Sequence, residues 1–175
     1  MLDRTLPHDL VAERAVLGAV LGFPDALKDV VDVIAVTDFF REAHRDVYRA
    51  VVDLVDAGTA IDFITVKAAL QSVRKLHDVG GPAYLASLTD GVPRSTNAGH
   101  YAEIVKEKAR LGEAIYAANK LLVNAYDADT PAAQLAERTV LRLASIADSA
   151  QIVTGHAVPL MDIITPAVEK IQEAQ

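Results

Sequence analysis

One long helical pattern constrains the fold of this chain more than any other feature. It covers residues 96–126, and within it only Gly99 and Gly112 weaken the helical propensity. A helix of that length measures roughly 45 Å, which is too long for a small domain to cover. The stretch DADTP, residues 127–131, then supplies a turn, capping side chains and a proline suited to a first helical turn. The pattern predicts an antiparallel helical hairpin whose second helix returns to about residue 148.

The two predicted helices each carry an apolar face at three- and four-residue spacing, and we expect these faces to pack together. On the first helix the face consists of Ile104, Lys108, Leu111, Ile115, Ala118, Leu122 and Ala125, and on the second of Ala132, Leu135, Ala136, Thr139, Leu143, Ile146 and Ala147. Other apolar residues lie off these faces, and a two-helix hairpin has no further surface to bury them. We expect the preceding region or another copy of the chain to cover them. The predicted oligomer or partner interface is Val105, Ala109, Tyr116, Leu121, Val123, Val140 and Leu141.

The residues before the hairpin have shorter helical patterns with frequent breaks, such as Pro24, Gly58 and the run Gly80-Gly81-Pro82. Hydrophobic residues make up 51% of the chain but aromatic residues only 5%, which favours helix-on-helix packing over a sheet core. The predicted fold class is all-α. The predicted divisions are a helical head at 1–95, the hairpin at 96–150, and a linker with a linker helix at 151–175.

The tripeptide His44-Arg45-Asp46 is also found in the catalytic loop of protein kinases, where an asparagine five residues later holds magnesium. Here that position is Val51, and the chain has neither a kinase Gly-rich loop nor the V-A-I-K lysine. The surrounding residues instead follow helical spacing, which predicts an amphipathic helix with a buried face. That face is Phe40, Ala43, Val47, Ala50, Val51, Leu54 and Val55.

No catalytic, cofactor-binding or metal-binding residue is predicted. The chain has no cysteine, its five histidines lack metal-ligand spacing, and no G-x-x-x-x-G-K-[ST] phosphate loop occurs. Carboxylates such as Asp9, Asp38 and Asp62 are interpreted as helix caps or turn residues. The net charge of −7 disfavours phosphate-backbone binding, and the run at 106–110 is typical of a solvated helix face, with a nucleic-acid contact as the alternative.

The N-terminus lacks the apolar run of a secretory signal, and no stretch approaches the roughly 18 apolar residues of a membrane span. The sequence therefore predicts a soluble, cytoplasmic protein with no membrane partner. At the other end, the polar stretch from Ser149 is expected to be a linker. Residues 159–173 then show a short amphipathic pattern that Pro166 should kink or divide. Its apolar residues are Leu160, Ile163, Ile164, Ala167, Val168 and Ile171.

Five blocks in order resemble the N-terminal domain of hexameric DnaB-type replicative DNA helicases. The blocks are LPHDLVAERAVLGAVL (6–21), DFFREAH (38–44), IDFITV (61–66), VGGPAYL (79–85) and NAGHYAEIVKEK (97–108). The resemblance covers residues 6 to about 148, and the order of the blocks makes it specific.

The resemblance implies a non-catalytic collar that assembles as dimers into a hexameric ring (a trimer of dimers) and docks primase and, in some systems, a helicase loader. A RecA-like motor domain would follow the linker, and ATP, magnesium and DNA would bind there rather than in this chain. The linker helix would pack on a neighbour's motor domain through Leu160, Ile163, Ile164, Val168 and Ile171.

Two other readings remain open at this point. One is a free-standing helical adaptor, or a phage regulator, that binds a host replicative helicase. The sequence that follows Gln175 would distinguish it from the collar, because a phosphate-loop domain there supports the collar. The other is an enzyme in its own right, which an ATPase assay on this chain would test.

Overall fold

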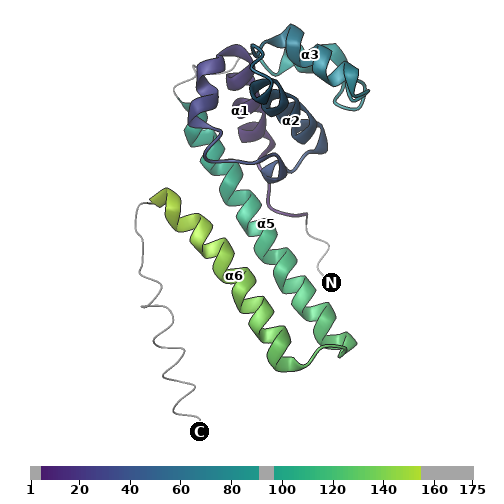
Figure 1. Ribbon diagram of the computed structural model, residues 1–175, viewed down its shortest axis with the longest axis vertical. Helices are drawn as coiled ribbons and strands as arrows, with labels where there is room; N and C mark the ends of the chain where they lie inside the picture. The colour runs from purple at the N-terminus through teal and green to yellow at the C-terminus, as the bar shows by residue number, and fades with distance from the viewer. Residues whose placement is uncertain (1–4, 91–96, 155–175) are drawn as a thin grey trace. The chain divides into compact units, whose positions relative to one another are not determined.

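The computed structural model describes residues 5–90 and 97–154, the last six of them as backbone only (Figure 1). Every regular element among these residues is helical, so the all-α prediction is confirmed. The chain forms two compact units, unit 1 at Met1–Glu113 and unit 2 at Ala114–Gln175. In chain order the elements, with η marking a 3₁₀ helix, are α1 (Leu10–Gly22), η1 (Pro24–Asp29), η2 (Val36–Asp38), α2 (Glu42–Asp56), α3 (Phe63–Ser72), α4 (Gly81–Ser87), α5 (Ala98–Asp127) and α6 (Ala132–Thr154).

Helix α1 lies at the centre of unit 1. After its first turn its sequence is apolar on nearly every side, and Val16, Leu17 and Val20 are fully buried. A helix that is apolar all round is stable in water only when other elements surround it. Both η1 and α2 pack against it, so α1 is the element around which unit 1 is built.

Helix α2 contains the His-Arg-Asp tripeptide, and the structure confirms the amphipathic helix predicted there. Val47 and Val51 are fully buried, and the Tyr48 ring packs on Phe39 with ring centroids 5.0 Å apart. Two residues of the predicted face lie elsewhere. Val55 is largely exposed near the end of the helix, and Phe40, just before α2, stacks on the His8 ring at 4.1 Å instead of entering the core.

The first turns of α5 belong to unit 1. Ala98, Ala102 and Val105 are spaced by four and three residues, and all three are buried in the unit 1 core. The boundary between the two compact units therefore falls inside α5, at residues 113/114. Val105 is 2% exposed, so unit 1 covers this side chain itself, which is the first of the two alternatives that the sequence left open.

Helix starts in unit 1 follow the predicted capping chemistry. Asp9 accepts hydrogen bonds from the Val11 and Ala12 amides at the start of α1. Asp62 accepts from the Thr65 amide at 2.8 Å, and the Thr65 hydroxyl accepts from the Asp62 amide in return. Hydrogen bonding to the Thr65 amide is the main cause that lowers the pKa of Asp62 below its ordinary value.

Two buried carboxylates of unit 1 form ion pairs. Asp38 caps the turn of η2 by accepting from the Ala35 amide, and it also pairs with Lys106 of α5 at 2.9 Å. Lys106 is therefore not part of a purely solvated basic face. Asp46 of α2 pairs with Lys75 at 3.3 Å, and this interaction raises the pKa of Lys75. Both pairs link segments that are far apart in the sequence.

In unit 2, the second part of α5 and α6 form an antiparallel hairpin, as predicted (Figure 1). The contact between them centres on two buried residues, Ala117 of α5 and Leu135 of α6. Leu135 belongs to the predicted face of α6. On α5, however, the row that faces α6 passes through Ala117 and Leu121, while Ile115 and Leu122 of the predicted face are exposed. Helix α6 continues to Thr154, past the predicted start of the linker, and the predicted linker helix lies outside the described residues.

Candidate functional site

The hairpin of unit 2 contains a groove between its two helices, which we call the hairpin groove. Its volume is about 340 Å³. Ala117, Leu121 and Leu135 form an apolar floor, and Tyr116 of α5 lies at the edge. Ala117 has the smallest side chain among the residues that line the groove.

The rim of the hairpin groove is basic. Lys120 of α5 and Arg138 and Arg142 of α6 line it, together with the polar side chains of Asn124 and Thr139. No carboxylate is among the lining residues of this groove. Arg138 and Arg142 are four residues apart, which places them on one face of α6. Their spacing relative to Lys120 could not be read from the sequence, because it depends on how α5 and α6 face each other.

Exposed apolar side chains form a second feature of unit 2. Leu122 and Val123 are each 49% exposed on α5, and Val140 and Leu141 are each 64% exposed on α6. Single exposed apolar residues are common on soluble proteins, but a group of this kind on a short hairpin is typical of an interaction surface. We call these four residues the exposed apolar set.

The predicted interface residues thus separate into distinct environments. Val123, Val140 and Leu141 belong to the exposed apolar set, whereas Tyr116 and Leu121 line the hairpin groove. Ala109 is half-buried in the part of α5 that belongs to unit 1, and Val105 lies in the unit 1 core, as described above.

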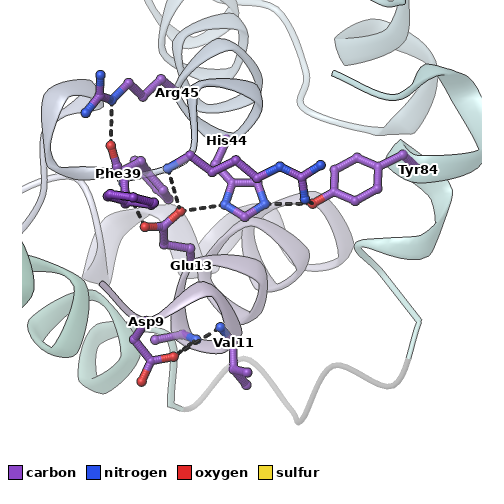
Figure 2. A network of polar contacts seen from close by, with 10 residues as sticks. Asp9, Val11, Glu13, Phe39, His44, Arg45 and Tyr84 are labelled. Atoms are coloured by element: carbon purple, nitrogen blue, oxygen red, sulfur yellow. Dashed lines mark hydrogen bonds and ion pairs between the residues drawn. The ribbon is translucent and has the colours of Figure 1, made fainter. Parts of the chain in front are cut away.

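Unit 1 contains a buried chain of polar contacts (Figure 2). Glu13 and His44 are almost completely buried, and the Glu13 carboxylate lies 2.6 Å from the Nδ1 atom of His44. The same carboxylate accepts from the Phe40 amide at 2.7 Å. On the other side of the ring, His44 Nε2 lies 2.7 Å from the Tyr84 hydroxyl, which also accepts a hydrogen bond from Arg41 at 2.9 Å.

The hydrogen-bonding capacities of these groups indicate which atom donates at the contact between Glu13 and His44. An ionised carboxylate only accepts, so His44 donates from Nδ1 to Glu13. Its Nε2 lies within hydrogen-bonding distance of the Tyr84 hydroxyl, whose oxygen accepts from Arg41, so each of these groups has a partner. The network joins α1, α2 and α4, and its role is to hold these helices together. The sequence interpretation assigned His44 no metal or catalytic role, and it did not identify Glu13 and Tyr84 as its partners.

The chain's residues do not fit an ATP–magnesium site. The sequence has no phosphate loop, and the residues that the structure describes bring together no group of three His, Cys, Asp or Glu side chains that could hold a metal ion. Among the described helices, none combines the length and apolar character needed to cross a membrane.

Comparisons with known proteins agree with the geometry. The family model for the DnaB-like helicase N-terminal domain matches residues 5–107. The replicative DNA helicase DnaB of Leifsonia xyli is 36% identical over 173 residues, which is 99% of this chain and 37% of that protein. DnaB of Mycobacterium leprae is 38% identical over 169 residues, covering 96% of this chain and 28% of that protein. The chain thus spans about a third of the length of these curated relatives.

Solved structures resemble this chain as well. The crystal structure of the N-terminal domain of DnaB helicase from Mycobacterium tuberculosis has a TM-score of 0.77 and 36% identity, and the match covers 81% of this chain and 99% of that one. A structure described as a DnaB-like replicative helicase and its interactions with primase has a TM-score of 0.65 over 92% of this chain and 35% of that one. It is 23% identical, so it supports the fold alone. With the family model matching more than half of its residues, this chain belongs to the family of DnaB-like helicase N-terminal domains.

Proposed function

We propose that this chain is the non-catalytic assembly and partner-docking module of a replicative DNA helicase. The observation that carries the proposal is the exposed apolar set of unit 2, Leu122, Val123, Val140 and Leu141. A two-helix hairpin cannot bury these residues on its own. Covering them with another protein surface is favourable by about 25 cal/mol per Å² of apolar area.

In this proposal the chain associates with copies of itself, first as dimers and then as a hexameric ring. Primase is a partner of the same module, and a helicase loader is a further one. Primase enters the proposal through the resemblance to the N-terminal domain of DnaB-type helicases; the description of one structural neighbour names interactions with primase, a statement that applies to that protein. The segment containing Leu160, Ile163, Ile164, Val168 and Ile171 docks on a neighbouring motor domain.

Hydrolysis of ATP, the use of magnesium and contact with DNA are assigned in this proposal to a motor domain, and the whole assembly acts in the cytoplasm. The basis is that curated relatives of this chain are replicative DNA helicases about three times its length. Within the chain, the proposed contribution to replication is the positioning of subunits and partners.

Sedimentation velocity of the purified chain tests the assembly part of the proposal. We expect the average sedimentation coefficient to rise with protein concentration as dimers and larger species form. A chain that stays monomeric at high micromolar concentration would contradict self-assembly. Adding the purified helical domain of a primase to the same samples tests partner docking separately, because a complex should sediment faster than either component.

A further inference from the structure

We propose that the hairpin groove binds an acidic amphipathic helix of a partner protein. This inference rests on the proposed function, because it names the chemistry of a partner for the same hairpin. The groove residues that carry it are Ala117, Leu121 and Leu135 on the floor, and Lys120, Arg138 and Arg142 on the rim.

The shape of the groove suits side chains inserted from a helix. On α5 the lining extends from Tyr116 to Asn124, which corresponds to about 12 Å of helix, or roughly two turns. A volume of about 340 Å³ holds a few apolar side chains but not a whole helix. The occupant therefore lies across the groove and inserts neighbouring apolar residues spaced three or four apart.

The charge of the groove selects an acidic occupant. The whole chain has a net charge of −7, yet three cationic side chains and no carboxylate line this groove. In the part of the chain that the structure describes, neither Lys120 nor Arg138 forms an ion pair. Carboxylates beside the inserted apolar residues would meet these cations at the rim. Such pairs contribute modestly to affinity and strongly to the choice and orientation of the partner.

Two other occupants fit less well. A nucleic acid strand would place phosphates and sugars over an apolar floor, and the acidic chain as a whole repels it. The α5 face of a second copy of this hairpin offers no carboxylate to the groove, since its only charged side chain in residues 114–126 is Lys120. On α6, Glu137 and Asp148 are accompanied by Arg138 and Arg142, so that helix is not acidic overall.

Fluorescence anisotropy with a labelled peptide tests the proposal. The probe is a helical peptide with leucines at i, i+3, i+4 and i+7 and glutamates on the flanking positions. One matched peptide carries lysines in place of the glutamates, and another contains the same residues in scrambled order. We expect the full chain to bind the acidic peptide at least ten-fold more tightly than either matched peptide, and we expect this binding to weaken as salt screens the rim charges.

The double variant Lys120→Glu/Arg138→Glu should raise the dissociation constant of the acidic peptide about ten-fold, because it replaces two attractive contacts with two repulsive ones. Lys28→Glu is the matched control. It exchanges a lysine of unit 1 that pairs with Asp25 on the surface, and it should leave peptide affinity unchanged. Amide chemical shifts should move in residues 116–124 and 135–142 and stay fixed in α3.

Three results would overturn the inference: equal affinity for acidic and basic peptides, affinity unchanged by the double variant, or an oligonucleotide that displaces the peptide from the groove at lower concentration than the unlabelled peptide does. If the chain does not bind the peptide but still self-associates on sedimentation, the groove proposal is wrong and the proposed assembly role stands. Loss of self-association with peptide binding intact would instead count against the proposed assembly role.

Discussion

At the scale of single residues, unit 1 depends on a few buried polar groups with matched partners. Glu13 and His44 are enclosed among apolar side chains, and each is satisfied by contacts from a different helix or loop. Buried polar networks of this kind rigidify a core when every member is paired, and they are costly when one member is missing. The network therefore specifies how α1, α2 and α4 pack.

Replacing Glu13 with alanine tests this role. The change leaves the Phe40 amide and His44 Nδ1 without their acceptor, and we expect the free energy of unfolding to fall by about 3 kcal/mol. Urea unfolding followed by circular dichroism measures the loss. Asp25→Ala is the control, since it removes a carboxylate that forms a surface pair with Lys28, and it should have no measurable effect. Equal unfolding midpoints for the two variants would show that the network contributes nothing.

At the scale of elements, the helices of unit 1 are bounded by side-chain caps and glycines. Helix α3 begins at the Asp62–Thr65 capping box, and α4 begins at Gly81 with Gly80 as its N-cap; these two glycines have φ values of +75° and +104°, respectively. Glycine adopts such φ values at little cost, whereas other residues are strained there. These caps and glycines involve only a few adjacent residues, and they occupy the helix starts that the sequence predicts.

The cap on α3 should make stability depend on pH. The pKa of Asp62 is lowered in the folded chain, so its stabilising contribution is present above the unfolded pKa of about 4 and is lost as the pH falls through the folded value. Asp62→Asn keeps an acceptor at the cap but does not titrate. We expect the stability of the variant to fall less steeply below about pH 4 than that of the unchanged protein. Parallel urea-midpoint profiles would contradict this expectation.

Gly80→Ala should destabilise the start of α4. A Cβ atom at this position would lie 2.9 Å from Cβ of Tyr84, and the φ of +104° is itself strained for alanine. We expect a loss of about 1 to 3 kcal/mol in the free energy of unfolding. Gly112→Ala is the matched control with the opposite sign, because nothing lies within 4 Å of that Cβ and alanine favours an α-helix. Two variants with the same stability would contradict both assignments.

At the scale of the whole molecule, the two units differ in how much of their apolar surface they bury. Unit 1 buries its own core. Unit 2 buries little more than Ala117 and Leu135 among its described apolar residues, and its exposed apolar set remains open. A hairpin with so small a core gains stability from partners, which is consistent with the proposed assembly role.

The double variant Leu122→Glu/Leu141→Glu tests whether the exposed apolar set mediates self-association. Charged side chains are costly to bury without partners, so we expect the sedimentation coefficient at high concentration to approach that of the monomer. Helix content should be unchanged, because both side chains are exposed. The control is Ile64→Glu, which changes a residue of α3 that is 74% exposed. Dissociation by the control instead of the double variant would place the contact on unit 1.

The amino-acid sequence by itself determined the helical class, the hairpin, the caps at Asp9 and Asp62, and the family resemblance. These features depend on spacing and on local chemistry, which are both readable along the chain.

The tertiary structure decided which row of α5 faces which neighbour. Helix α5 has apolar residues on more than one side, so periodicity alone could not show that Val105 lies in the unit 1 core or that Leu122 stays exposed. It also brought Glu13, His44 and Tyr84 together, and placed Lys120 beside Arg138, because contacts between distant segments depend on how helices pack and leave no local pattern in the sequence.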